Sequence, residues 1–135
     1  MRIGHPLRAL VAERATFRCE YCYYPEEFSP SSFEVEHIKS LTAGGLTKLE
    51  NLALACSHCN RHKSIKQEGI DPVTKRAARL FNPRTNGWSK HFILDRTTGI
   101  IEGITPIGRA TVKVLCMNDI QPLTARRNLI RLEIL

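Results

Sequence analysis

The feature of this 135-residue sequence that most constrains its fold is a pair of Cys-x-x-Cys motifs. The motifs are Cys19–Cys22 and Cys56–Cys59, and residues 23–55 separate them. Two such motifs supply four thiolates, the donor set of a closed tetrahedral zinc site with sulfurs at about 2.3 Å from the metal. A closed site leaves no position for substrate, so we expect a structural Zn2+. Its binding would be coupled to folding of the segments that carry the cysteines.

Hydropathy and the cysteines together predict the compartment. No apolar run approaches the length of a membrane span, and the first residues lack the apolar core of a signal peptide. We therefore expect a soluble, cytoplasmic protein with no membrane partner. Thiols stay reduced in that compartment, which favours a metal site over disulfides. The alternative, that the four cysteines are only small buried side chains, does not explain the equal spacing within the two pairs.

Positive charge gathers in one stretch of the chain. Lys and Arg number 20 against 13 Asp and Glu, which gives a net charge of +7. Between Ser57 and Lys90, eight basic residues stand against Glu68 and Asp71. A clustered positive field attracts a polyanion, because each neutralised phosphate releases condensed counterions. On charge alone, however, an ordinary solvated surface is the favoured interpretation.

Periodicity and turn residues predict short elements along the chain. Helical spacing follows Pro6 as far as Thr16, and alternation of polar and apolar residues predicts a strand within 33–38 after a loop over 23–32. Further elements are expected in order: a helical turn over 49–55, a helix over 57–66, an irregular basic segment over 71–84, a hairpin of strands 91–94 and 99–104, and helices over 106–117 and 123–135. The last helix is expected to place Arg126, Arg127 and Arg131 on its polar side.

Three short motifs lie inside or beside the cysteine frame. They are Glu34-Val-Glu36-His37-Ile38, Asn51-Leu-Ala-Leu and Cys59-Asn60-Arg61-His62-Lys63. In this order, and bracketed by cysteine pairs, they resemble the HNH endonuclease family over residues 19–63. The resemblance implies a zinc-stapled ββα-metal module that binds one catalytic divalent metal and hydrolyses DNA phosphodiester bonds.

Phosphodiester hydrolysis needs a base to deprotonate water and a cation to hold the charge that develops on the phosphate. By resemblance His37 is the base, and the near-neutral reference pKa of histidine suits that role. Glu36 and Asn60 are the implied ligands of the metal. The family commonly has Asp where this chain has Glu36, so the metal preference is open. Oxygen donors suit Mg2+ or Mn2+, whereas a histidine ligand favours Mn2+, Ni2+ or Zn2+.

The helix after Cys56 offers two candidate ligands. Asn60 and His62 are two residues apart, about 200° round a regular helix, so their side chains diverge. We favour Asn60, which holds the family's third position. His62 stays a phosphate contact or the second candidate for the metal site or for catalysis. Asn51 is expected to brace the loop after the strand through hydrogen bonds, and so to hold the backbone and tautomer of His37.

The basic residues near these motifs are assigned to DNA. Arg61 and Lys63 flank the site, and Lys66 and Arg84 extend the positive stretch. The predicted function is therefore a metal-dependent endonuclease whose partner is double-stranded DNA. One alternative is a non-catalytic zinc module that binds nucleic acid, but such a module has no use for an acid, a base and an amide together. The other is a zinc-stapled protein-interaction domain, which leaves the positive stretch unexplained.

The predicted fold class is α+β. At this length the chain can bury only a modest core, so we expect one small module with an appendage. The zinc-stapled HNH module would occupy residues 1–70. Residues 71–135 would form a basic α/β extension, a hairpin plus helices, that packs on the module and does not fold independently.

Overall fold

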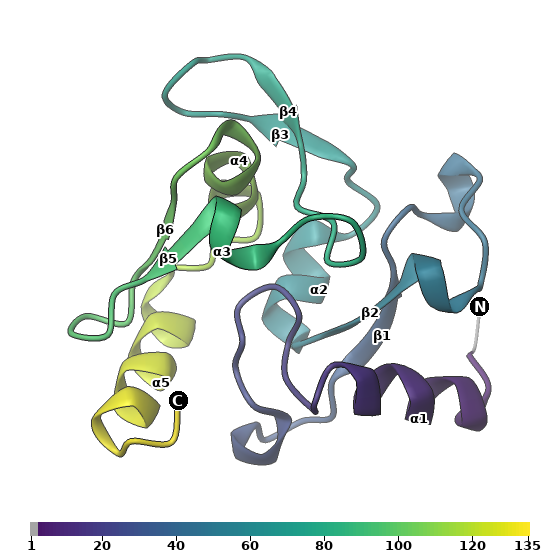
Figure 1. Cartoon of the computed structure of the whole chain (residues 1–135), viewed down its shortest axis with the longest axis horizontal. Coiled ribbons are helices and arrows are strands. Elements are labelled where there is room, and N and C mark those ends of the chain that lie inside the picture. Colours follow the sequence, from purple (N-terminus) through teal and green to yellow (C-terminus); the bar gives the residue numbers. More distant parts are fainter. Residues whose placement is uncertain (1–2) are drawn as a thin grey trace. The chain divides into compact units, whose positions relative to one another are not determined.

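The computed structural model describes residues 3–135, which form two compact units (Figure 1). Among the described residues, the first unit comprises residues 3–67 with Asn82–Arg84, and the second comprises Glu68–Phe81 with Thr85–Leu135. Both contain helices and short antiparallel strand pairs, which confirms the predicted α+β class. The division of the chain into folding domains at residue 70 stays a prediction.

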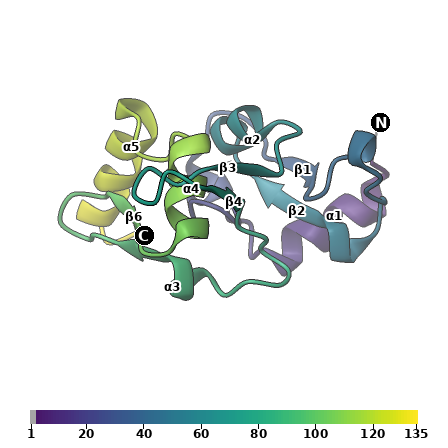
Figure 2. The same ribbon diagram turned by 90° about the horizontal axis from the view of Figure 1, so that it is seen from above.

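The first unit is built on a two-stranded hairpin with a helix on either side (Figure 2). Helix α1 begins with a proline in its first turn, where the missing N–H costs nothing. The unit contains, in order, α1 (His5–Arg14), η1 (Glu26–Phe28), β1 (Glu34–His37), η2 (Leu41–Ala43), η3 (Leu49–Asn51), β2 (Leu52–Ala55) and α2 (Ser57–Lys63). Its core gathers the buried side chains of Val11, Tyr21, Phe33, Leu52 and Leu54.

Strand β2 corrects part of the prediction for residues 49–55. A helical turn was expected throughout, but the turn ends at Asn51 and the chain continues as a strand. Pairing with β1 aligns Glu36 with Ala53 and His37 with Leu52. All four residues of β2 are buried, so the strand lacks the alternation that marks a half-exposed one. Burial on both faces therefore hid this strand from the sequence pattern.

The second unit contains two hairpins and three helices. Its elements are β3 (Glu68–Ile70), β4 (Ala77–Arg79), α3 (Trp88–His91), β5 (Phe92–Leu94), β6 (Ile101–Gly103), α4 (Pro106–Val114) and α5 (Ile120–Arg131). The β5–β6 hairpin confirms the one predicted from alternation. The β3–β4 hairpin was missed, because residues 71–84 were expected to be irregular. Its turn is fixed by buried Asp71, which accepts two hydrogen bonds, at 2.8 and 2.9 Å, from Arg109 of α4.

Arg126 of α5 is buried, although the sequence pattern placed it on the polar side. Its guanidinium donates to the carbonyl oxygens of Gly99 at 2.5 Å and Met117 at 3.1 Å, and to Oδ1 of Asn118 at 3.0 Å. These acceptors replace water, which is how an arginine can enter a core. Along the described part of the chain, no helix has the length and apolar character needed to cross a membrane.

Candidate active site and metal centre

The four cysteines of the two motifs come together in the first unit. Their sulfurs all lie within 4.8 Å of one another, and the Sγ atoms of Cys22 and Cys56 are 3.8 Å apart. Tetrahedral zinc with sulfurs at about 2.3 Å places neighbouring sulfurs roughly 3.8 Å apart. Cys19, Cys22 and Cys59 are buried, and Cys56 is partly exposed. The cluster therefore fits the predicted structural Zn2+ in donor type and in spacing.

Residues 19–24, here called the first zinc loop, form a tight turn. The backbone N–H of Cys22 donates to the sulfur of Cys19 at 3.5 Å, and Tyr23 adopts a left-handed backbone with φ of 67°. In the second motif, Cys56 caps α2 and its sulfur accepts from the N–H of Cys59 at 3.4 Å. Contact with the Cys19 thiol and burial raise the pKa of Cys22 and of Cys59. A divalent cation relieves this crowding, because it stabilises the thiolates together.

A cavity of about 470 Å³ opens where β1 ends and α2 passes. It brings together three predicted site residues, Glu36, His37 and Asn60. The remaining lining residues are Val35, Ser40, Leu41, Thr42, Arg61, Ser64 and Ile65. Glu36 and His37 of β1 and Asn60 of α2 thus line one cavity, so two segments supply an acid, a histidine and an amide.

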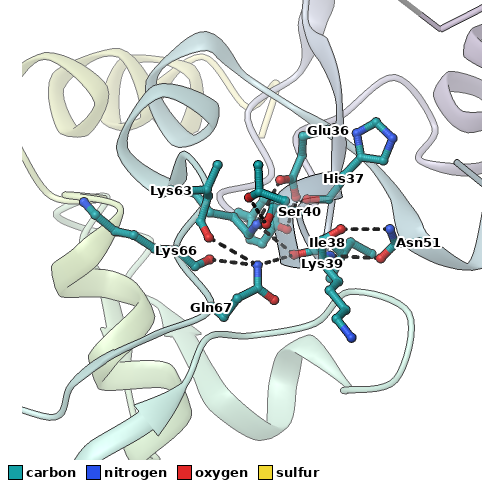
Figure 3. A network of polar contacts seen from close by, with 12 residues as sticks. Glu36, His37, Ile38, Lys39, Ser40, Asn51, Lys63, Lys66 and Gln67 are labelled. Atoms are coloured by element: carbon teal, nitrogen blue, oxygen red, sulfur yellow. Dashed lines mark hydrogen bonds and ion pairs between the residues drawn. The ribbon is translucent and has the colours of Figure 1, made fainter. Parts of the chain in front are cut away.

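The Glu36 carboxylate is buried and held at both oxygens. The hydroxyl of Tyr21 donates a short hydrogen bond to Oε1. Nζ of Lys63 lies 3.0 Å from Oε2, and Figure 3 shows Glu36 and Lys63. Burial raises the pKa of Glu36, while the Lys63 ammonium and the Tyr21 hydroxyl oppose that rise. Lys63 also donates to the carbonyl oxygen of Ile38 at 3.0 Å. Removing either charge would leave its partner buried without compensation, which is strongly destabilising.

His37 is the last residue of β1, and strand alternation sends its ring away from the Glu36 carboxylate (Figure 3). Its Nε2 lies 2.8 Å from the hydroxyl oxygen of Thr47, in the loop between η2 and η3. Burial lowers the pKa of His37 below the ordinary value of histidine. The ring is therefore neutral at neutral pH, the protonation state of a base.

Asn51 clamps the loop that follows β1. Its Oδ1 accepts from the backbone N–H of Lys39 at 2.9 Å, and its Nδ2 donates to the carbonyl oxygens of Lys39 at 3.0 Å and Leu46 at 2.8 Å. The backbone oxygen of Asn51 also accepts from the N–H of Ile38 at 2.9 Å. These bonds hold the backbone of Ile38 and Lys39, the two residues after His37. The backbone of His37 itself was the expected partner.

We expect Gly45→Ala to destabilise the protein by about 2 kcal/mol or more, because overpacking forces a backbone shift. A Cβ at Gly45 would lie 1.8 Å from the carbonyl oxygen of Lys39 and 2.9 Å from Nδ2 of Asn51. Urea unfolding followed by circular dichroism measures the change. Gly4→Ala is the control, since its Cβ would meet nothing nearer than 3.9 Å. Equal unfolding midpoints for the two variants would contradict the clamped loop.

The two candidate ligands of α2 point in different directions. Asn60 lines the cavity, whereas His62 is not among the described residues that do. Nδ1 of His62 lies 2.7 Å from the carbonyl oxygen of His58, and the two histidine rings are 4.1 Å apart. The roughly 200° between positions 60 and 62 accounts for this divergence.

A comparison with known protein families matches the part of the chain that carries the cysteines and the cavity. Residues 19–66 match the sequence model of the family described as HNH endonuclease. This segment is similar to an HNH domain, and residues 19–66 are called the HNH domain below. The match covers less than half of the chain, and no curated protein and no solved structure matched. An HNH domain indicates a nuclease or a nucleic-acid-binding function.

The four basic residues assigned to DNA fall into two pairs. Arg61 and Lys66 are exposed on and just after α2 of the HNH domain. Lys63 is buried against Glu36, and Arg84 is ion-paired with Glu20. Burial first, and Arg14 second, lower the pKa of Arg84 to about 10. Arg61 and Lys66 can therefore meet a polyanion at the surface, although the Lys66 ammonium also donates to the carbonyl oxygen of His62 at 3.2 Å. The other two brace the domain.

Tyr21 and Thr47 contact the candidate site of the HNH domain and were not singled out by sequence. Tyr21 lies between Cys19 and Cys22, and its hydroxyl contacts Glu36, fifteen positions further along the chain. The Cys-x-x-Cys motif predicts the zinc ligands but not this tertiary contact. Thr47 lies in a loop whose closure depends on Asn51 and Gly45. No local sequence pattern predicts such contacts. The one signal for Tyr21 was the presence of a tyrosine inside a Cys-x-x-Cys motif.

Proposed function

We propose that this protein is a metal-dependent endonuclease that hydrolyses phosphodiester bonds of double-stranded DNA. The observation that carries the proposal is the single cavity of the HNH domain lined by Glu36, His37 and Asn60. A carboxylate, a neutral imidazole and an amide are the groups that metal-assisted hydrolysis of a phosphate diester uses. A module that only binds nucleic acid does not need this combination.

The donor chemistry of the cavity fits a divalent cation. Glu36 and Asn60 offer a carboxylate and an amide oxygen, the ligand types that Mg2+ and Mn2+ take. Once bound, such a cation supplies stabilisation of the charge on the phosphate and the leaving oxygen. Lys63 already neutralises Glu36, so we expect weaker cation binding than a free carboxylate would give.

His37 accepts the proton of the attacking water in this proposal. The contact between Nε2 and Thr47 restrains the ring, and the clamp made by Asn51 restrains the backbone that follows it. A base needs this restraint, because misplacement of about 1 Å costs much of its effect. His62, which contacts His58 instead, has no part in the step.

Exposed Arg61 and Lys66 would contact phosphates on either side of the cut. Arg61 lines the cavity itself, and Lys66 follows α2 at the surface. Such contacts hold the backbone without reading base identity. We therefore expect little sequence preference from these two residues and a binding constant that falls steeply with salt.

Plasmid relaxation tests the proposed function. Supercoiled plasmid is incubated with the purified protein in Mg2+, in Mn2+ or in EDTA, and the same protein is tested in EDTA for a gel shift of linear duplex. We expect nicked plasmid with a metal and a gel shift alone in EDTA. A gel shift without cleavage under either metal would instead favour the non-catalytic nucleic-acid-binding module.

The rate of cleavage is expected to fall on acidification only below the ordinary pKa of histidine. The base works when neutral, and burial lowers the pKa of His37, so protonation removes activity at a lower pH than for an exposed histidine. A pH profile of nicking at saturating metal measures this, with the acidic limb expected below about 6.5. An acidic limb well above that value would contradict the role given to His37.

A further inference from the structure

Tyr21 joins the zinc centre to the candidate metal-binding carboxylate. It lies in the first zinc loop between Cys19 and Cys22, and its side chain is fully buried. Its hydroxyl donates to Oε1 of Glu36, across fifteen positions of sequence. The same carboxylate reaches Lys63 of α2 through Oε2 at 3.0 Å. Glu36 is thus held between the zinc loop and the helix.

The two contacts engage different oxygens of the Glu36 carboxylate. A glutamate side chain has several rotatable bonds, and a single ion pair with Lys63 leaves it free to turn toward the ammonium. The Tyr21 hydroxyl holds the other oxygen and fixes the plane of the carboxylate. Hydrogen bonds to an ionised acceptor are short and roughly twice as strong as neutral ones, so this one can hold the side chain in place.

We propose that Tyr21 is a positioning residue, which orients Glu36 for the divalent cation and makes that orientation depend on the folded zinc loop. The inference rests on the proposed function, because it assigns Glu36 to the cation. Partners that orient a metal ligand typically change metal affinity or activity by 10-fold to 100-fold. Packing alone would be served equally well by phenylalanine, so the hydroxyl is the group under test.

Tyr24 supplies a matched control in the same loop. Its hydroxyl donates to the carbonyl oxygen of Phe28 at 3.1 Å, at the surface and without contact to Glu36 among the hydrogen bonds of the described residues. Tyr21→Phe and Tyr24→Phe therefore remove the same group from neighbouring positions of one zinc loop. Zinc content and thermal unfolding are measured first for both variants and for the unaltered protein.

The deciding measurement is direct Mn2+ binding by electron paramagnetic resonance, with plasmid nicking measured alongside it. We expect Tyr21→Phe to keep its zinc, to bind Mn2+ about 10-fold to 100-fold more weakly, and to lower kcat with little change in KM for DNA. Added Mn2+ should recover part of the lost rate. Tyr24→Phe should match the unaltered protein in every measurement.

Two results for Tyr21→Phe overturn the inference. Unchanged Mn2+ affinity in Tyr21→Phe would show that the hydroxyl does not orient the carboxylate. Loss of zinc or of folding in Tyr21→Phe alone would make Tyr21 a packing residue of the zinc loop. If the unaltered protein binds Mn2+ but never nicks DNA, the proposed function fails while the role of Tyr21 is still decided by the binding data. If the unaltered protein does not bind Mn2+, both fail together.

Discussion

Replacing His37 by alanine is expected to slow plasmid nicking by about 100-fold to 10,000-fold, the range that a general base contributes. The loss should be fullest above the pKa of His37 and should shrink below it, where the unaltered protein also lacks a neutral imidazole. His37 is partly exposed and makes its ring contact with Thr47 alone among the described hydrogen bonds, so its removal should spare the fold. Initial rates of nicking at saturating Mn2+, for folded protein, measure the effect.

His5→Ala is the matched control for this experiment. His5 is exposed at the start of α1 and is not among the residues that line the candidate cavity at the end of β1. We expect it to nick plasmid at the unaltered rate. Residual activity of His37→Ala close to that of the control would remove His37 from the mechanism, even though the HNH domain would still be a nucleic-acid domain.

Removing zinc is expected to unfold the first unit. Structural zinc contributes apparent binding free energies of roughly 10–16 kcal/mol, and the net stability of a whole domain is only about 5–15 kcal/mol. The first unit is a small hairpin between two helices with a modest core, so its other interactions are not expected to compensate for the loss of zinc binding. Far-UV circular dichroism during titration with a strong chelator should therefore show loss of structure, and Cys59→Ser should reproduce it without chelator.

Cys116→Ser provides the comparison, since Cys116 is the cysteine outside the cluster and lies beyond the end of α4. That variant should keep its zinc and its spectrum. A first unit that holds its spectrum and its melting temperature after complete loss of zinc would show that the four cysteines are only small core side chains, the alternative set aside on their spacing.

Elements that obey a strong local rule could be predicted from the sequence. The zinc cysteines, β1 and the β5–β6 hairpin follow from spacing, alternation and turn residues. Elements fixed by tertiary partners could not. Strand β2 is buried on both faces and carries no alternation, and the β3–β4 hairpin depends on Asp71 meeting Arg109 from a distant helix. Arg126 is charged and yet buried, because surrounding carbonyl oxygens accept hydrogen bonds from its guanidinium.

The candidate site shows the same boundary between local and tertiary information. The order of the motifs is enough to predict Glu36, His37 and Asn60, and the geometry of a regular helix separates Asn60 from His62. The charge pattern, however, assigned Lys63 and Arg84 to DNA together with Arg61 and Lys66. It had no means to see that Lys63 lies against Glu36, since an ion pair between a strand and a helix leaves no trace in local composition.

The side-by-side cleavage rates of Asn60→Ala and His62→Ala test most directly whether the chemistry lies in the cavity at the end of β1. Both variants remove a polar side chain from the same helix, so effects on DNA binding and on folding are matched. We expect Asn60→Ala to lose nicking by about 100-fold and His62→Ala to retain it within a few-fold, on the same plasmid with Mn2+. The reverse pattern, with Asn60→Ala active and His62→Ala silent, would contradict the account.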